Sequence, residues 1–339
     1  MNKDITISVL ITTYNRVTFL ETTVSLFISQ IISGGLIDQV EVIIGNDASS
    51  DGTKEYLDQL KTKYQFIKVI NHSTNLGLSG NVEALVAEAS GEYIWHFGED
   101  DLIIGGAIKK ILESISANDP NYIIINTKNI ISLDNRNLDY KIVVDNRLNI
   151  QKDIFIDNFE TESDKLLKIE NWLYLTGLLS AVACKRKLFL DWMDRAKRYV
   201  HKDNVYLYQA PIIMGISKLG KLYMVAEPLV LHRKNENHWT GSVPRILIVN
   251  LYDSREIVDV IKAYMPNESA RYQKRFAAFI LAIILLAKKN GINVNKYIID
   301  ALKRNFNCYP YNIRFLITLL MPSIILRRFL DLYYFIFNK

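Results

Sequence analysis

Residues 91–101 read Gly-Glu-Tyr-Ile-Trp-His-Phe-Gly-Glu-Asp-Asp, and the rest of the chain is interpreted outward from this stretch. Its residues 93–97 form a short apolar run rich in aromatics, a composition typical of a buried strand. A glycine ends the run, and three carboxylates follow directly: Glu99, Asp100 and Asp101. Like charges so close together repel one another unless a cation or solvent compensates them. By itself the triplet is explained by a solvated turn before the next helix, or by a Mg²⁺ or Mn²⁺ site that bridges substrate phosphates.

Strands and helices alternate over the first 125 residues. Continuous apolar runs, typical of strands covered on both faces, predict strands at Ile5–Ile11, Val40–Ile44, Phe66–Ile70, Tyr93–Phe97 and Tyr122–Ile125. Apolar residues spaced three and four apart predict amphipathic helices around residues 20–31, 56–64, 82–89 and 108–115. This alternation predicts βαβ units and a mostly parallel sheet.

Polar loops follow three of the predicted strands, at residues 12–16, 46–53 and 98–101. Ligands of open α/β sheets bind beyond the carboxyl ends of the strands. We therefore expect the three loops to lie along one edge of the sheet. In that setting the acidic triplet becomes a candidate binding site instead of an isolated turn.

Several motifs in one order and spacing now resemble those of family 2 glycosyltransferases. They are Ser-Val-Leu-Ile-Thr-Thr-Tyr-Asn-Arg at 8–16, Glu-Val-Ile-Ile-Gly-Asn-Asp-Ala-Ser-Ser-Asp-Gly-Thr at 41–53, Asn-Leu-Gly at 75–77 with Asn81, Gly-Glu-Tyr-Ile at 91–94 and Glu-Asp-Asp at 99–101. The resemblance is dense from residue 5 to about 110 and thinner to about 240. It implies an inverting enzyme that uses a nucleotide-sugar donor. It also implies the GT-A fold, a Rossmann-like, mostly parallel sheet flanked by helices. With Leu102 and Gly105, the Gly-Glu-Asp-Asp ending is most similar to bacterial surface-polysaccharide transferases.

The resemblance also implies which residues bind the donor, UDP-sugar being the favoured one. They are Thr12, Tyr14, Arg16, Asn46, Asp47, Asn75, Gly77, Asn81, Asp100 and Arg233. Tyr14 is expected to contact the base through its ring, and Asp47 to accept a hydrogen bond from the base. Asn46 stands where many members of the family have a second Asp.

Simpler explanations exist for some of these residues. By residue type alone, Thr12 and Tyr14 are equally well explained by packing at a strand end. Asp51, followed by Gly52, is better explained as a cap of the next helix than as a ligand contact.

The metal site is implied in the same way. Asp101 and Glu99 match the last and first positions of the family's Asp-x-Asp motif, with Glu in place of the usual Asp at the first. His232 is expected to complete the shell around Mn²⁺ or Mg²⁺, and Arg233 to neutralise phosphate charge. A basic pair at the surface, without a ligand, explains these two residues equally well.

The middle of the chain, residues 126–244, is expected to bind the acceptor. Residues 126–160 predict irregular hairpins or loops, and residues 164–175 predict a helix. Residues 176–184 resemble the family's small-residue segment under the acceptor site. An inverting transfer needs a general base, and the family places it after this segment, which makes Asp203 the candidate. Asp191 and Asp194 are rivals that an amphipathic helix with solvated acids explains better.

The charge of the chain is unevenly distributed. Its 339 residues carry a net charge of +5. Residues 245–339 contain 15 Lys and Arg against 6 Asp and Glu, a net charge of +9, whereas residues 1–244 contain 26 against 30, a net charge of −4. Such an asymmetry predicts that the tail meets an anionic surface. Nucleic acid is not expected, because no recognised nucleic-acid motif accompanies the charge.

The tail is expected to be helical, over 245–265 and 269–289. Its longest uncharged apolar runs, 276–287 and 315–326, have 12 residues each. A helix of that length spans about 18 Å of a hydrocarbon layer about 30 Å thick, so neither run crosses a membrane. Basic and aromatic residues around the second run predict an interfacial anchor: Arg314, Arg327, Arg328, Tyr333, Tyr334 and Phe335.

The predicted organisation is a nucleotide-sugar-binding half (1–125), an acceptor-binding half (126–244) and a basic helical appendage (245–339). Cys184 and Cys308 fit no metal or redox spacing, and the first residues do not resemble a signal peptide, so we expect a cytoplasmic protein held at the inner face of the membrane. The expected reaction is transfer of a sugar to a glycan acceptor, in particular a lipid-linked one. The alternative is a catalytically degenerate subunit that binds nucleotide sugars.

Overall fold

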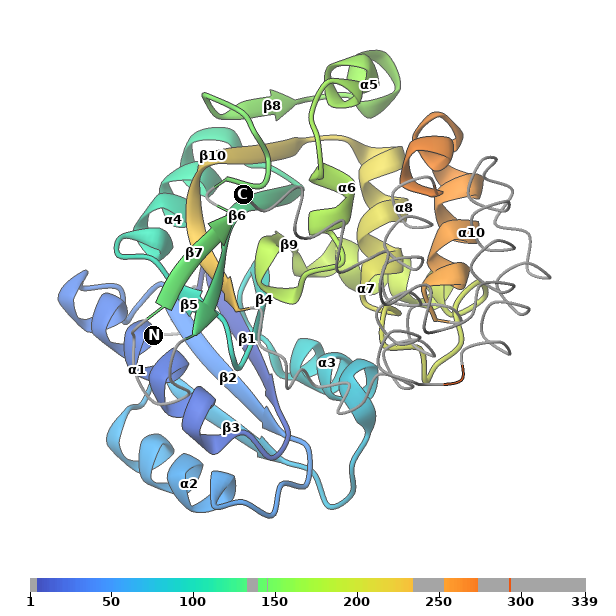
Figure 1. Ribbon diagram of the computed structural model, residues 1–339. Helices are drawn as coiled ribbons and strands as arrows, with labels where there is room; N and C mark the ends of the chain where they lie inside the picture. Colours follow the sequence, from blue (N-terminus) through green and yellow to red (C-terminus); the bar gives the residue numbers. More distant parts are fainter. Residues whose placement is uncertain (1–4, 133–139, 145, 234–252, 274–292, 294–339) are drawn as a thin grey trace, which may run out of the picture. The chain divides into compact units, whose positions relative to one another are not determined.

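The computed structural model describes residues 5–132, 140–144, 146–233, 253–273 and 293 (Figure 1). The chain divides into two compact units, residues 1–236 and 237–339. In the second, the described part contains α10 (Ser254–Tyr264) and a helical stretch at 266–273, inside the predicted helical appendage. The apolar runs at 276–287 and 315–326, the proposed anchor around them and Cys308 lie outside the described residues. Within the described part, no helix combines the length and apolarity that crossing a bilayer requires.

The first unit is built on one sheet. Its strands are β1 (Ile7–Thr13), β2 (Val40–Asn46), β3 (Ile67–Asn71), β4 (Tyr93–Gly98), β5 (Leu102–Ile103), β6 (Tyr122–Ser132), β7 (Tyr140–Val144), β8 (Ile154–Ile156), β9 (Val182–Lys185) and β10 (Leu222–Arg233). The order along the sheet is β3-β2-β1-β4-β9-β6-β10-β5, with β7 paired to β6 and β8 to β10. Neighbours among β3, β2, β1 and β4 are parallel, as are β6 and β10. Among the described strands, antiparallel pairs join β9 to β4 and β6, β7 to β6, and β5 and β8 to β10, so the sheet is mixed. The predicted α/β class is confirmed, with the parallel pairing concentrated in β3, β2, β1 and β4.

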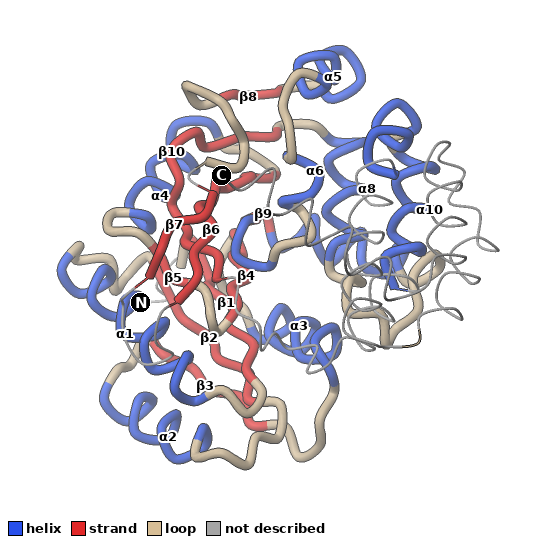
Figure 2. The backbone as a smooth tube through the Cα atoms, in the orientation of Figure 1, coloured by secondary structure: helices blue, strands red, loops and turns tan. Residues whose placement is uncertain are grey.

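Helices cover both faces of this sheet (Figure 2). They are α1 (Val17–Ser33), α2 (Thr53–Lys63), α3 (Gly77–Glu88), α4 (Ala107–Asn118), α5 (Phe159–Leu167), α6 (Trp172–Leu175), the short 3₁₀ helix η1 (Leu179–Ala181), α7 (Arg186–Ala196) and α8 (Gln209–Leu219). Ile7, Val9 and Ile11 of β1 share one apolar cluster with residues of α1, α2 and α4. The other face of β1 and β2 packs against α3. Because every residue of β1, β2 and β4 is buried, these strands read as continuous apolar runs.

The structure departs from the sequence prediction between β6 and α7. The prediction of one continuous helix over 164–175 is wrong. α5 ends at Leu167, and a turn that contains Asn171 at φ 65° separates it from α6. The Asn158 side chain fixes an earlier start for α5 by accepting from the backbone N–H of Glu160 (2.9 Å) and Thr161 (3.3 Å). Residues 182–184 belong to β9, an antiparallel strand inserted between β4 and β6. The predicted hairpin character of 126–160 is confirmed by the β6–β7 pair.

Close packing of α3 on β2 gives a stability prediction. A Cβ on Gly45 would lie 2.0 Å from Oδ1 of Asn81, a buried side chain that also donates to the Gly45 carbonyl (2.9 Å) and contacts His72. We expect Gly45→Ala to lower the free energy of unfolding by about 1–3 kcal/mol through overpacking. Chemical denaturation measures it, with Gly105→Ala as the control, since a Cβ there meets nothing within 4 Å. Equal midpoints for the two variants would contradict the prediction.

Candidate active site at the carboxyl edge of the sheet

The strands that precede Asp47 and Asp101 both pair with β1. Thr13 of β1 is in register with Asn46 of β2, and Thr12 is in register with Gly98 of β4. Because the three strands are parallel, the loops at their carboxyl ends share one edge of the sheet. The structure therefore brings the loops at 12–16 and 46–53, the nucleotide-side loops, together with the acidic loop at 98–101, as expected from the sequence.

The loops after β1 and β2 are joined by hydrogen bonds. The Asn15 backbone N–H donates to Ser49 Oγ (2.9 Å), and the Ser50 backbone N–H donates to Asn15 Oδ1 (2.8 Å). Asn15 adopts a left-handed conformation at φ 54°, which Asn tolerates better than most residues. The two loops thus form one connected surface beside β1.

Asp51 serves the N-termini of two helices. Its Oδ2 accepts from the backbone N–H of Val17, the first residue of α1 (3.0 Å). Its Oδ1 accepts from the backbone N–H (3.3 Å) and the hydroxyl (2.5 Å) of Thr53, the first residue of α2. The expected capping role is confirmed, and it extends to a second helix. Negative charge at a helix N-terminus also interacts favourably with the helix dipole.

Asp47 is 3 % exposed and lies between β1 and the start of α3. Its backbone N–H donates to the Thr13 carbonyl (3.0 Å), and its Oδ1 accepts from the backbone N–H of Leu76 (2.7 Å). Among the described residues, the side-chain hydrogen bond of Asp47 goes to Oδ1 and none goes to Oδ2. The nearby Tyr14 side chain is 48 % exposed at the end of β1. An exposed aromatic ring, and a carboxylate oxygen without a hydrogen bond from the described residues, suit the two roles expected of them at a nucleotide base.

Four of the other predicted donor-binding residues are buried or hydrogen-bonded within the protein, at the carboxyl edge of the sheet. Thr12 is buried in β1. The Asn46 amide donates to Asn71 Oδ1 (2.8 Å) and accepts from the Ser49 backbone N–H (3.1 Å). Asn75 Oδ1 accepts from the backbone N–H of Gly77 (2.9 Å), which has φ 72° at the first residue of α3. Asn81, also among the predicted donor-binding residues, is 1 % exposed, and both its amide oxygen and its amide nitrogen are hydrogen-bonded inside the protein.

One face of α1 holds the acidic loop. Arg16 Nη1 forms an ion pair with Asp100 Oδ2 (2.8 Å), and its Nε lies 3.5 Å from Glu99 Oε1. The Thr23 hydroxyl lies 2.8 Å from the backbone carbonyl oxygens of both Glu99 and Asp101. Residues 16 and 23 are seven apart and therefore lie on the same side of the helix. The loop is fixed by its backbone and by one arginine.

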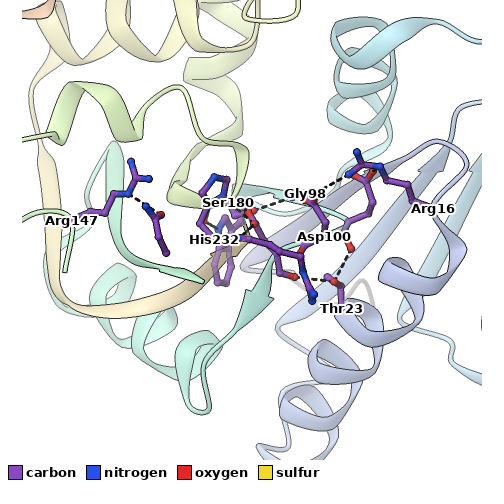
Figure 3. Close-up of polar contacts among 12 residues, drawn as sticks. Arg16, Thr23, Gly98, Asp100, Arg147, Ser180 and His232 are labelled. Carbon is purple, nitrogen blue, oxygen red and sulfur yellow. Dashed lines mark hydrogen bonds and ion pairs between the residues drawn. The ribbon is translucent and has the colours of Figure 1, made fainter. Parts of the chain in front are cut away.

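Asp101 is the most enclosed of the three carboxylates, at 4 % exposed. His232 Nδ1 lies 3.0 Å from Asp101 Oδ1, and the Arg233 backbone N–H donates to the same oxygen (3.1 Å). The Ser180 side chain also hydrogen-bonds to Asp101, and its Oγ accepts from the Gly98 backbone N–H (3.0 Å). Figure 3 shows His232 and Ser180 meeting beside this loop, with Arg16 on its other side. β4, η1 and β10 therefore converge on one carboxylate.

Arg233 is directed into the acidic loop. Arg233 is only 3 % exposed, and its side-chain Nε donates a hydrogen bond to the Asp100 carbonyl (2.9 Å). Its guanidinium carbon lies 5.2 Å from the centroid of the Phe19 ring, and that of Arg16 lies 5.9 Å from the same ring. Phe19 thus supports the two arginines expected near the donor phosphates.

The three acids have different environments. Burial and the neighbouring Asp100 charge raise the pKa of Glu99 to about 8, against the pull of Arg16. Burial alone would raise the pKa of Asp101, but the His232 charge and the hydrogen bonds from Ser180 and Arg233 lower it. The pKa of His232 is raised, because Asp101 and Asp100 outweigh the burial of the ring. Asp101 and His232 therefore each favour the charged form of the other.

The donor set of this pair fits a hard divalent ion. Within the described residues, no three His, Cys, Asp or Glu side chains gather into a metal-binding cluster, and Glu99 is directed to Arg16. Mg²⁺ and Mn²⁺ sites at phosphates need only one or two protein carboxylates, since water and phosphate oxygens supply the remaining ligands. Asp101 and His232, 3.0 Å apart, are the residues that would hold such an ion.

Asp203 lies on an exposed loop between α7 and α8. Its side chain is 74 % exposed and contacts His201 Nδ1 at 3.6 Å. The next residue, Asn204, accepts a hydrogen bond through its carbonyl from the Ser79 hydroxyl (2.6 Å) near the start of α3. This bond fastens the loop to the nucleotide side of the first unit. The rivals Asp191 and Asp194 are both exposed on α7, as expected for solvated acids of an amphipathic helix.

Sequence reasoning missed three contributors to the site: Phe19, Thr23 and Ser180. The first two were detectable, because they follow Arg16 at helical spacing on the face of α1 that meets the acidic loop. Ser180 lies in the small-residue segment, but nothing in the sequence shows that β9 pairs between β4 and β6 and so carries η1 to Gly98.

The chain is similar in sequence to known glycosyltransferases. Residues 8–174 match the family model described as Glycosyl transferase family 2. The chain is 26 % identical over 254 residues, 71 % of each protein, to "Abequosyltransferase RfbV" of Salmonella typhimurium. It is 29 % identical over 108 residues to the "GalNAc(5)-diNAcBac-PP-undecaprenol beta-1,3-glucosyltransferase" of Campylobacter jejuni, which covers 32 % of this chain and 33 % of that protein.

Solved structures with the same fold include S. aureus TarS 1-349 in complex with UDP. That match has a TM-score of 0.54 at 13 % identity and covers 89 % of this chain and 88 % of that one. The mannosyltransferase PcManGT from Pyrobaculum calidifontis, in complex with GDP-Man and Mn²⁺, matches with a TM-score of 0.51 at 10 % identity over 100 % of this chain and 89 % of that one.

Proposed function

Because this chain is a family 2 glycosyltransferase with the GT-A fold, we propose that it transfers a sugar from a nucleoside diphosphate sugar to a glycan acceptor, with inversion and with a divalent metal ion. The observation that carries the proposal is the common edge of the sheet. There, Tyr14, Asp47 and Asp101 follow β1, β2 and β4, which pair side by side. His232 of β10 reaches Asp101 at the same edge.

The donor is proposed to bind across the ends of β1, β2 and β4. Tyr14 stacks on the base and Asp47 accepts a hydrogen bond from it. UDP is the favoured nucleotide, in keeping with the TarS complex. Asp101 and His232 would hold Mn²⁺ or Mg²⁺, and such an ion would supply positive charge at the diphosphate leaving group. Arg16 and Arg233, both supported by Phe19, add fixed positive charge beside the acidic loop.

Asp203 is the proposed general base. In an inverting transfer, a carboxylate takes the proton of the acceptor hydroxyl on the side of the sugar opposite the leaving group. The Ser79–Asn204 hydrogen bond supports this role, since it holds the Asp203 loop against the helix that begins at the nucleotide edge. The high exposure of the Asp203 side chain leaves it accessible to an incoming hydroxyl.

The proposed acceptor is a lipid-linked glycan of bacterial surface polysaccharide synthesis, met at the inner face of the membrane. Both curated relatives are glycosyltransferases, and the C. jejuni protein is named for an undecaprenol-linked acceptor. The net charge of +9 over residues 245–339 supports contact with an anionic membrane surface. Vesicle flotation with and without anionic lipid tests this part.

Metal and donor are tested together by nucleotide release. We expect one nucleotide sugar among a panel of UDP-, GDP- and dTDP-sugars to be turned over with Mn²⁺ or Mg²⁺. Turnover should fall to background in EDTA and return when Mn²⁺ is added in excess. The anomeric configuration of the product, measured by NMR, tests inversion. Full activity in EDTA would exclude the metal role, and nucleotide binding without turnover of any donor would favour the non-catalytic alternative.

A further inference from the structure

Arg147 is a buried cation without an anionic partner among the described residues. It is 8 % exposed, and its Nε donates to Asn129 Oδ1 (2.9 Å). Its guanidinium carbon lies 5.0 Å from the centroid of the Tyr174 ring. No Asp or Glu in the described part of the chain forms an ion pair with it. A buried guanidinium is costly unless an anion compensates it, so an arginine kept in this state is suited to a ligand.

The neighbouring amide has an unused donor. Asn129 is 1 % exposed, and because arginine only donates, its Oδ1 must face Arg147. The amide nitrogen, Nδ2, therefore points away from Arg147, and it has no hydrogen-bond partner within the described residues. Thr127, two residues earlier on the same strand face, has a buried hydroxyl that also lacks a partner there. Buried polar groups are normally satisfied, so these atoms indicate a missing ligand.

The backbone of Arg147 is held in place by two asparagines from other parts of the chain. Asn126 Oδ1 accepts from the backbone N–H groups of Arg147 (3.1 Å) and Leu148 (3.0 Å), and Asn171 Nδ2 donates to the Arg147 carbonyl (2.9 Å). The guanidinium is therefore positioned before any ligand arrives. Preorganised charges of this kind lose little entropy on binding.

The position of the group relates it to the candidate active site. Asn129 of β6 is in register with His232 of the parallel strand β10, so their side chains lie on the same face of the sheet. Figure 3 shows Arg147 on the opposite side of His232 from Arg16. Arg16 belongs to the nucleotide side, whereas β6 and the segment that carries Tyr174 belong to the predicted acceptor half.

We propose that Arg147 and Asn129, with Tyr174 as a partly exposed wall, form a subsite for an anionic group of the acceptor, either a phosphate or a carboxylate. A guanidinium and an amide N–H present donors only, which is the arrangement that these two oxyanions require. The subsite would place an acceptor anion beside the ion held at His232 and away from the base of the donor. This inference rests on the proposed function for its biological meaning, but the anion site itself is testable without turnover.

Thermal unfolding of the full chain tests the site, with UDP and Mg²⁺ saturating so that the donor site is filled. Inorganic phosphate and glucuronate are titrated separately at constant ionic strength, to distinguish a phosphate from an acidic sugar. We expect at least one of them to raise the Tm saturably in the wild type, as binding to the folded state must. Arg147→Gln should raise the dissociation constant for that anion by about tenfold or more, as the loss of a charged hydrogen bond predicts.

Two further variants make the test specific. Arg195→Gln is the matched control, because Arg195 also lies over an aromatic ring (Trp192, 4.7 Å) but is exposed on α7. It should respond as the wild type does. Asn129→Asp keeps the oxygen that accepts from Arg147 and replaces the free donor by a carboxylate. It should therefore abolish the anion response without loss of Tm, which settles the test even if Arg147→Gln does not fold.

The opposite outcomes are equally specific. An equal response of the wild type, Arg147→Gln and Asn129→Asp would overturn the subsite. So would loss of the phosphate response in the wild type when UDP and Mg²⁺ are present, since the anion would then bind at the donor site. If UDP, GDP and dTDP all fail to raise the Tm, the nucleotide-sugar proposal fails, and the response to phosphate without nucleotide still decides the Arg147 subsite.

Discussion

Asp101→Asn is expected to reduce turnover of the nucleotide sugar by at least about 10³-fold, because a divalent ion at a leaving diphosphate is worth several kcal/mol of transition-state stabilisation. The amide keeps the size of the side chain and its acceptor for the Arg233 backbone N–H, but loses the charge that pairs with His232. Mn²⁺ affinity in the presence of UDP should fall in parallel. Nucleotide release and calorimetric titration of Mn²⁺ measure the two effects.

Asp58→Asn is the control for this variant. It removes the same charge from an exposed position on α2, where Asp58 pairs with Lys54 and Lys61. Its turnover and Mn²⁺ affinity should equal those of the wild type, since surface ion pairs contribute little. A folded Asp101→Asn protein with wild-type Mn²⁺ affinity would remove Asp101 from the metal site.

Asp203→Asn is expected to lower kcat for sugar transfer by about 10²–10⁴-fold, the usual contribution of a general base. Its affinity for UDP should not change, because the Asp203 side chain is 74 % exposed, and the hydrogen bond from Ser79 of α3 goes to the backbone carbonyl of Asn204. Single-turnover transfer, with UDP binding measured on the same preparation, separates the two quantities.

The rivals on α7 decide the identity of the base. Asp191→Asn and Asp194→Asn remove the same charge from exposed helix positions and should keep kcat within about twofold, as solvated surface acids do. If one of them loses transfer while Asp203→Asn keeps it, the base is on α7.

The parallel half of the fold was predictable from the sequence because local and tertiary signals agree there. The apolar runs at Ile7–Thr13, Val40–Asn46 and Tyr93–Gly98 are buried on both faces, so their composition alone identifies them as central strands. Each is followed by a polar loop, and parallel pairing brings those loops to one edge. The positions of Asp47 and Asp101 at that edge followed from topology.

The acceptor half was less predictable because its contacts are between distant parts of the chain. The break at Asn171 depends on a left-handed residue that periodicity does not reveal, so one long helix was predicted where two short ones occur. The insertion of β9 between β4 and β6 is set by pairing over about 60 to 90 residues of sequence, as Tyr122 with Cys184 and Tyr93 with Lys185 show. The hydrogen bond between Ser180 and Asp101 depends on that insertion, so the composition of the sequence could not predict it.

The type of a residue also did not show whether its side chain is available to a ligand. Asn81 and Asn46 were assigned to the donor, yet both amides are occupied by neighbouring protein groups. Arg147, in contrast, belongs to an Asn- and Asp-rich stretch with no recognisable pattern. Only the folded chain shows that it is buried and lacks an anionic partner among the described residues.

The sharing of Asp51 between α1 and α2 has a practical consequence for engineering donor preference. Together with the Asn15 bonds to Ser49 and Ser50, it makes residues 13–17 and 47–53 a single cassette. If only one of the two segments were replaced by that of a relative, hydrogen-bonding groups of the other segment would lose their partners. Chimaeras that exchange both segments at once therefore have the better prospect of yielding folded enzymes with altered nucleotide choice.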